Sequence, residues 1–443
     1  MEIFCFYRWG LDYFKVWWWK RLTDVCRRWR EIIFASPRFL DLRLKCTERT
    51  PTRRSLDIWP PFPISIYSYH QKLDDEGRDN IIAALDHHGR VIQINIGGAI
   101  LETFFAVTRK PFPVLTDLGL TSYDETAPVL HEDFLGGSMP CLQRFSLCKI
   151  GFPTFPKLAL SCSSLSHLFL SQIPIAGYIS PEAMATCLAT FPSLRDLSIG
   201  FESPRSRPDR IGLPPPTRAV LPSLTRFRFK GVSEYLEDLV ARIDTPNLFG
   251  LEIRFFMDLM FNIPQLHKFI VRAKGTKSLN SAQITFSSSD IEITVGHDVH
   301  LVIICREPDW QASSMAQVCS QLSPLLSHVE QLHIHDYMPG QERQGNGIDP
   351  TLFLELFHPF PAMQRLHIHS ELIPLVARAL QELTGDGATE VLPSLRRLVF
   401  QDPPPSGSIK KDIQGFITAR QNSNHPVDVG WRQSIMSVLS SEP

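Results

Sequence analysis

The chain has 443 residues, of which 43% are hydrophobic, so it is long enough for one extended domain with a small module beside it. Its 45 basic and 46 acidic residues give a formal net charge of −1, which argues against nucleic acid or a membrane surface as a partner. Nine cysteines without a CxxC pair or a Cys/His ligand spacing argue against a disulfide framework and a zinc module.

The N-terminal segment is aromatic, but Glu2, Arg8, Asp12 and Lys15 interrupt it, so it lacks the continuous apolar core of a signal peptide. Nowhere do about 18 apolar residues run together, as a membrane-spanning helix requires. We therefore expect a protein of the reducing cytoplasm or nucleus.

Residues 22–44 predict an amphipathic helix, a sharp stop and a strand-like tail. The apolar residues of the helix recur at helical spacing and form one face: Leu22, Val25, Cys26, Trp29, Ile32 and Ile33. On that face Cys26 is expected in the core rather than as a nucleophile. Pro37 disfavours the helical conformation at Ser36, so the helix should end near Ala35.

The run VCRRWREIIFASPRF in this stretch resembles the last helix of an F-box, which ends in a Val-Cys-(Arg/Lys)-x-Trp run and a Ser-Pro turn. The rest of the chain resembles a group of fungal F-box proteins that carry irregular leucine-rich repeats. The resemblance implies docking on the Skp-type adaptor of a cullin-RING (SCF) ubiquitin ligase. The residues that match the docking pattern are Ile3, Phe4, Leu22, Val25, Cys26, Trp29 and Pro37.

A repeat governs the chain from about residue 111. Each copy often begins with Pro and continues with an apolar residue, two variable residues, an apolar residue, one variable residue and another apolar residue. The first apolar positions are Leu115, Leu142, Leu165, Leu194, Leu224, Leu248, Leu266, Val329, Met363 and Leu395. Most copies follow at about 20 to 35 residues, the period of leucine-rich repeats, in which each unit supplies one parallel strand and a return segment. The long step before Val329 contains the strand-like runs AQITF, IEITV and VHLVII.

Several return segments predict helices. In SPEAMATCLATF, Ser180 is a candidate N-cap and Pro181 occupies the first helical position. The runs SEYLEDLVARI, LFLELF, ELIPLVARALQEL and KKDIQGFITAR also show helical spacing.

The predicted fold is α/β: an irregular leucine-rich-repeat solenoid of parallel strands with helical or loop returns, preceded by a small α-helical F-box-like module. We expect that module, incomplete at its N-terminus, at 1–44, a connecting segment with the first solenoid units at 45–110, the solenoid at 111–402 and a C-terminal cap or tail at 403–443.

Within each copy, residues between the apolar positions should point to the concave face of the solenoid. The copies at Leu224, Leu248 and Leu266 place six basic residues there: Arg226, Arg228, Lys230, Arg254, Lys268 and Arg272. Glu252 offsets only part of this charge. The patch is either a solvated face without a partner or a dock for an acidic or phosphorylated segment, which arginine recognises bidentately.

Two later copies place four histidines side by side on the same face: His333, His335, His367 and His369. Four imidazoles can bind zinc or respond to pH, but a rigid sheet holds them in a flat rectangle that suits tetrahedral zinc poorly. We therefore favour a partner contact or a tolerated polar face and predict no metal.

The sequence shows no nucleophile elbow, P-loop or dinucleotide fingerprint, so we predict neither an enzyme nor a cofactor. By resemblance, the chain is a substrate-recognition adaptor of an SCF-type ligase. Its partners would be the Skp-type adaptor, the cullin scaffold and a protein substrate. The alternative is a ligase-independent leucine-rich-repeat interaction scaffold.

Overall fold

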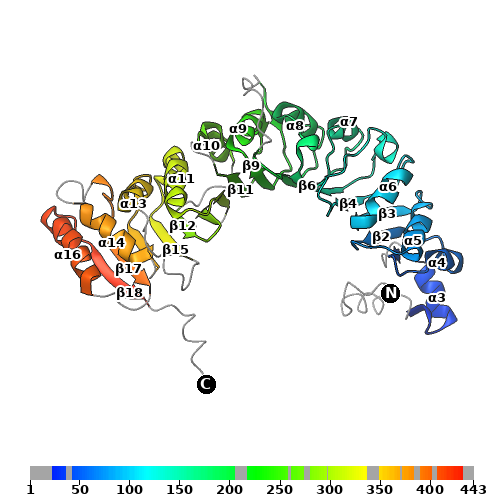
Figure 1. Cartoon of the computed structure of the whole chain (residues 1–443), viewed down its shortest axis with the longest axis horizontal. Coiled ribbons are helices and arrows are strands. Elements are labelled where there is room, and N and C mark those ends of the chain that lie inside the picture. The colour runs from blue at the N-terminus through cyan, green and yellow to red at the C-terminus, as the bar shows by residue number, and fades with distance from the viewer. Residues whose placement is uncertain are drawn as a thin grey trace. The chain divides into compact units, whose positions relative to one another are not determined.

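A computed structural model of the chain describes residues 22–35, 42–204, 217–257, 261–273, 280–296, 298–336, 349–369, 372–383, 390–401 and 407–432. The chain separates into two compact units, Met1–Glu202 (unit 1) and Ser203–Pro443 (unit 2), and each is a mixed α/β layer of strands and helices (Figure 1). The four-part division of the chain stays a prediction.

Unit 1 contains a parallel sheet whose strands follow one another in chain order. The strands are β1 (Leu44–Cys46), β2 (Ile64–Ser68), β3 (Val91–Gly97), β4 (Asp117–Thr121), β5 (Arg144–Cys148), β6 (His167–Ile173) and β7 (Asp196–Phe201). Its helices are α3 (Arg27–Phe34), α4 (Thr52–Ile58), α5 (Asp75–Leu85), α6 (Leu101–Val107), α7 (Phe155–Ala159) and α8 (Pro181–Leu188). Ser180 caps α8, as predicted, because its hydroxyl accepts a hydrogen bond from the backbone N–H of Ala183 at 3.2 Å.

The strands of unit 2 begin with β8 (Ala219–Val220), β9 (Arg226–Gly231), β10 (Ile243–Asp244) and β11 (Gly250–Phe256), followed by β12 (Ser281–Phe286), β13 (Asp290–Val295) and β14 (Val299–Ile304). Its last strands are β15 (Gln331–Asp336), β16 (Arg365–Ile368), β17 (Arg397–Gln401) and β18 (Asp428–Arg432). The helices are α9 (Ser233–Arg242), α10 (Pro264–Arg272), α11 (Pro308–Gln321), α12 (Ser323–Leu326), α13 (Pro350–Phe357), α14 (Ile373–Glu382) and α16 (Gly407–Asn422).

The labelled helices of unit 2 lie on one face of its sheet (Figure 1). Alternation within the strands explains this layering: in β9, Phe227 and Phe229 are buried, whereas the alternating residues Arg226 and Arg228 are exposed. We call the side of the sheet that carries the alternate, polar residues the strand face.

The sheet of unit 2 reverses direction in its middle. Its strand order is β9-β11-β14-β13-β12-β15-β16-β17-β18, and β13 runs antiparallel to both β12 and β14. The outer members of this meander pair in parallel with β11 and β15. The runs AQITF, IEITV and VHLVII are therefore strands, as predicted, but the chain traverses them in the order opposite to their place in the sheet.

The predicted repeat is confirmed at nine of its ten copies, where a strand starts two residues after the first apolar position. The copy at Leu266 is wrong, because residues 264–272 form α10. Its apolar residues Ile263, Leu266, Phe269 and Ile270 are all buried and have helical spacing, and Pro264 begins the helix. The segment predicted as a C-terminal cap or tail contains α16, where KKDIQGFITAR predicted a helix, and the sheet strand β18.

The predicted helix over Leu22–Ile33 is interrupted. Leu22 and Thr23 are helical, a turn follows, and α3 begins at Arg27 and ends at Phe34. Cys26 is the N-cap, with φ −162° and ψ 167°, and its Sγ accepts from the backbone N–H of Trp29 at 3.5 Å. The expected core position of Cys26 is therefore wrong, because a cap residue at a helix start remains at the surface.

Candidate functional site

The strand face of β9 and β11 carries four of the six residues predicted to form a basic patch. We call Arg226, Arg228, Lys230 and Arg254 the basic surface. The register of the parallel pair places Arg228 beside Glu252 and Lys230 beside Arg254. The side chains of Arg228 and Arg254 are 45% and 47% exposed, so a partner can reach both.

Glu252 neutralises part of the basic surface. Its carboxylate lies 3.7 Å from Arg228 Nε and accepts a hydrogen bond from Arg254 Nε at 3.0 Å. Lys230 Nζ lies 5.5 Å from the centre of the Phe256 ring, a cation–π contact. The four cations thus outnumber the carboxylate that faces them on these two strands.

Lys268 and Arg272 do not belong to this surface, which corrects the prediction. Both lie on α10, away from the strand face. There the guanidinium of Arg272 contacts the carboxylate of Asp244 at 3.3 Å and donates to the backbone oxygen of Val240 on α9. Burial lowers the pKa of Arg272, and the nearby Arg218 lowers it further. These two residues therefore belong to the helix layer and not to the strand face.

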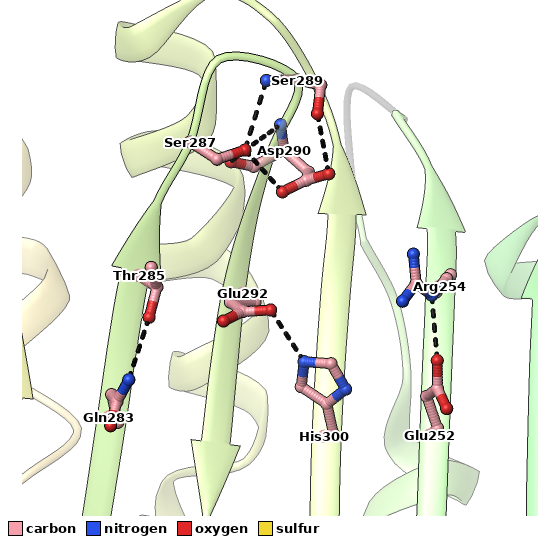
Figure 2. A network of polar contacts seen from close by, with 9 residues as sticks. All are labelled: Glu252, Arg254, Gln283, Thr285, Ser287, Ser289, Asp290, Glu292 and His300. Carbon is pink, nitrogen blue, oxygen red and sulfur yellow. Dashed lines mark hydrogen bonds and ion pairs between the residues drawn. The ribbon is translucent and has the colours of Figure 1, made fainter. Parts of the chain in front are cut away.

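Beyond β11, the strand face carries a network of polar side chains that pair with one another (Figure 2). His300 on β14 contacts the carboxylate of Glu292 on β13 at 2.9 Å, and Gln283 donates to Thr285 on β12 at 3.3 Å. At the β12–β13 turn, the Ser287 hydroxyl donates to the Asp290 carboxylate at 2.6 Å. This network separates the basic surface from the next group of titratable residues.

The four predicted histidines lie side by side, with His333 and His335 on β15, His367 on β16 and His369 directly after β16, and we call them the imidazole cluster. The rings of His333 and His367 stack with centroids 4.2 Å apart and planes 10° from parallel. His335 lies 6.1 Å from His333 and 6.1 Å from His369. Burial lowers the pKa of His335, and the charges of His333 and His369 lower it further.

Among the residues that the structure describes, no group of three or more His, Cys, Asp or Glu side chains is placed to hold a metal ion. The stacked, flat arrangement of the imidazole cluster explains this, because tetrahedral coordination needs nitrogens that converge on one point. The cluster can instead donate and accept hydrogen bonds across the sheet.

Arginines beside the imidazole cluster were missed at the sequence level. Arg365 on β16 and Arg397 on β17 are exposed and directly opposite each other in the sheet. They occupy the third position of the copies at Met363 and Leu395, the same position that selected Arg226. The repeat pattern therefore contained the signal that would have found them.

The residues matched to the F-box pattern lie in different environments. Val25 is 58% exposed, Cys26 is exposed and Trp29 is half-buried, whereas Leu22 is buried within the chain. Leu22 therefore cannot offer its side chain to an adaptor in this conformation. Ile3, Phe4 and Pro37 lie outside the described residues.

Buried cysteines of the described chain are poor nucleophiles. Burial raises the pKa of Cys46 and Cys162 to about 11 and that of Cys187 to about 12, so these thiols stay protonated at neutral pH. No described helix is long and apolar enough to cross a lipid bilayer.

No family model and no curated protein sequence matches this chain. Among solved structures, the chain is similar to the leucine-rich repeat-containing protein LegL7 from Legionella pneumophila. The TM-score is 0.28 and the identity 12%, over 85% of this chain and 97% of that chain. A TM-score this low does not establish a shared fold, so the fold class is assigned from the strands and repeats of this chain. Its repeated strand–return pattern and large, mostly parallel sheet give a mixed α/β fold of the leucine-rich-repeat kind.

Proposed function

We propose that the chain is a recognition protein that binds a partner protein on the strand face of unit 2. We further propose that it serves an SCF-type ubiquitin ligase by docking its N-terminal segment on the Skp-type adaptor. The basic surface carries the first proposal, because its four basic side chains on β9 and β11 outnumber Glu252, the carboxylate on the same two strands, and stand on a rigid sheet. Ubiquitin transfer would belong to the partner enzymes.

The ligase proposal rests on the resemblance of VCRRWREIIFASPRF to the end of an F-box, together with the exposure of Val25 and Cys26. Exposed apolar side chains at the start of a helix are available to a partner. The charged residues around them would keep the free segment soluble.

Co-purification of a Skp-type adaptor with the full chain tests the ligase proposal. Val25→Asp should reduce the recovered adaptor at least tenfold, because it places a charge in an apolar contact. Val220→Asp is the matched control, since Val220 is 56% exposed on β8 and Val25 is 58% exposed. Failure of the adaptor to co-purify with the unaltered chain would show that the ligase role is wrong.

The alternative is an interaction scaffold that acts without a ligase, with the N-terminal segment packed internally. One observation favours it: Ile33 is fully buried, and the ring of Phe34 packs edge-to-face against Trp59 at 6.2 Å and against Phe62 at 5.5 Å. The helix α3 thus already has an intramolecular partner. A chain that binds partners through the basic surface but recovers no adaptor would establish this alternative.

A further inference from the structure

The strand β18 ends the sheet of unit 2. It pairs in parallel with β17, and no other described strand pairs with its second edge. A strand at the edge of a sheet presents unpaired backbone N–H and C=O groups, which form a template for another strand. The open edge of β18 is therefore a place where a further chain can add to the sheet.

Alternation of the backbone shows which groups of β18 face the open edge. The N–H of Asp428 donates to the backbone oxygen of Arg396 at 2.9 Å, so Asp428 directs its backbone groups toward β17. Alternate residues of an extended strand have the same orientation, so Gly430 also faces β17, whereas Val429 and Trp431 face the open edge. The open edge thus offers two N–H donors and two C=O acceptors.

Apolar side chains accompany these backbone groups. Trp431 lies opposite the buried Phe400 of β17, with ring centroids 4.9 Å apart, on the side of the sheet that faces the helices. Trp431 is nevertheless 44% exposed, and Val429, on the same side of the strand, is only half-buried. On β1, the other terminal strand, Leu44 and Cys46 are each 1% exposed. Solenoids need a polar outer face on their last repeat, so the apolar end at β18 indicates a contact surface.

We propose that two copies of the chain associate through β18, with the strands antiparallel and related by a two-fold axis at Gly430. In this register Val429 lies opposite Trp431 of the second copy, and the two residues exchange both backbone hydrogen bonds. The axis repeats this exchange on its other side, so all the outward-facing groups of both strands are paired. A shift of the register by two residues would instead set one of these residues opposite a position outside β18.

The same register makes the side chains complementary. On the helix side of the sheet, each Val429 faces an indole ring of the other copy, and pairs of an aromatic with a β-branched residue stabilise adjacent strands. At the alternate positions Asp428 lies opposite Arg432 of the second copy, a residue type of opposite charge. A second copy of β18 therefore matches this edge in hydrogen bonding, apolar contact and charge.

The expected dimer is weak. Only five residues of each strand pair, so the contact should bury less than the roughly 1,200 Å² typical of stable interfaces. We expect a dissociation constant in the micromolar range. Sedimentation velocity of the full chain over about 1 to 200 µM should show the mass rising from that of a monomer toward that of a dimer.

Trp431→Lys should raise the dissociation constant at least tenfold, because it places a charge in the apolar pair and a lysine at the open edge. Phe249→Lys is the matched control, since Phe249 is an aromatic residue of unit 2 that is 48% exposed outside β18. Hydrogen exchange of the β17 amides checks that Trp431→Lys leaves the last repeat folded.

A cysteine on the axis tests the register. A Cβ atom added to Gly430 would lie 3.5 Å from Arg397 Nη2, an ordinary contact, so Gly430→Cys fits the structure. The two Cα atoms at this non-hydrogen-bonded position come within about 4.5 Å, which a disulfide can span. Mild oxidation should therefore link Gly430→Cys into a dimer at least tenfold faster than it links the unaltered chain, which already has exposed cysteines. Asp428→Cys is the control, because its two copies lie roughly 13 Å apart along the strands.

Three results would overturn the proposal. A chain that stays monomeric up to about 200 µM has no such interface. A dimer that Trp431→Lys weakens no more than Phe249→Lys does must form elsewhere. Equal linking of Gly430→Cys and Asp428→Cys would contradict the antiparallel register. None of these outcomes depends on the proposed binding of a partner at the basic surface.

Discussion

A buried carboxylate on α9 holds the start of α10. The oxygens of Glu237 accept hydrogen bonds from the backbone N–H groups of Gln265 at 2.7 Å and Leu266 at 2.8 Å. Glu237 thereby satisfies two of the donors that a helix N-terminus leaves without an intrahelical partner. Burial raises the pKa of Glu237 to about 7, although both backbone hydrogen bonds and Lys268 lower it.

The raised pKa of Glu237 predicts a pH-dependent stability of α10. Between about pH 4.5 and pH 7 the folded protein holds a proton that the unfolded chain has released, so stability falls as pH rises through this window. The contribution is roughly 2 to 3 kcal/mol. Hydrogen exchange of α10 amides, compared at pH 5 and pH 7 after correction for intrinsic rates, should show this loss.

Glu237→Gln should remove that pH dependence and lower the protection of α10 at both pH values. One backbone N–H then faces the NH2 group of the glutamine, which cannot accept a hydrogen bond. The expected cost is about 1 to 3 kcal/mol. Glu355→Gln, an exposed change on α13, serves as the control. A pH dependence of α10 that persists in Glu237→Gln would assign it to another group.

Single residues also mark the limits of the sequence patterns. Cys26 has the right spacing for an apolar helix face, yet the backbone there is extended and the thiol caps α3. Periodicity cannot separate a continuous helix from two helical segments joined by a turn, because both place the same residues on one side. Arg365 and Arg397, in contrast, follow directly from the repeat.

At the scale of elements, alternation predicted the strands, and helical spacing predicted the return helices α8, α9, α13, α14 and α16 but not α7, α10, α11 or α12. The copy at Leu266 failed because IPQLHKFIV satisfies both templates over so few residues, and only Pro264 and the spacing of Phe269 favour the helix. The reversal of β12, β13 and β14 could not be predicted from alternation. Alternation shows which residues face the core, but not which neighbouring strand each strand edge pairs with. Gly296, at φ 62°, marks the turn after β13 but does not specify the partner strand.

A buried arginine side chain helps to attach the terminal helix α16 to the last repeat. Arg420 is 0% exposed and donates to the backbone oxygens of Leu392 at 3.0 Å, Leu395 at 2.8 Å and His425 at 3.1 Å. A guanidinium with several acceptors can stay charged inside a protein. The residue joins α16 to the segment that leads into β17.

Arg420→Met should detach the C-terminal elements, because it removes the three hydrogen bonds that the guanidinium donates to backbone carbonyl groups. We expect a loss of about 3 to 5 kcal/mol in this region. Amides of α16 and β18 should then exchange at least tenfold faster, whereas those of β9 and β11 stay protected. Arg378→Met, at an exposed position of α14, should change neither set.

At the scale of the molecule, unit 2 presents the basic surface and the imidazole cluster, and a network of polar side chains that pair with one another lies between them. In the network, the carboxylate of Glu292 contacts His300, whereas that of Glu252 contacts Arg228 and Arg254 of the basic surface. Because exposed charges are screened by dissolved ions, binding at the basic surface should respond strongly to salt.

Arg226→Glu, Arg228→Glu and Arg254→Glu together should weaken binding of a glutamate-rich peptide at pH 7.5 at least tenfold and reduce its dependence on salt. The control triple Arg53→Glu, Arg54→Glu and Arg378→Glu makes the same change in net charge at exposed positions of α4 and α14. Anisotropy titrations over a range of salt concentrations measure both effects. An equal loss in both triples would indicate a general effect of net charge.

The reversed meander also affects how the protein is made. A ribosome completes β11 at Phe256, but the strand that pairs beside it, β14, begins only at Val299, after β12 and β13. At about 5 to 20 residues per second, β11 waits roughly 2 to 9 s with an unpaired edge. Edge strands are sites of unwanted association between chains. The charged pair Glu252 and Arg254 on β11 would hinder such association while the nascent chain lacks its neighbour.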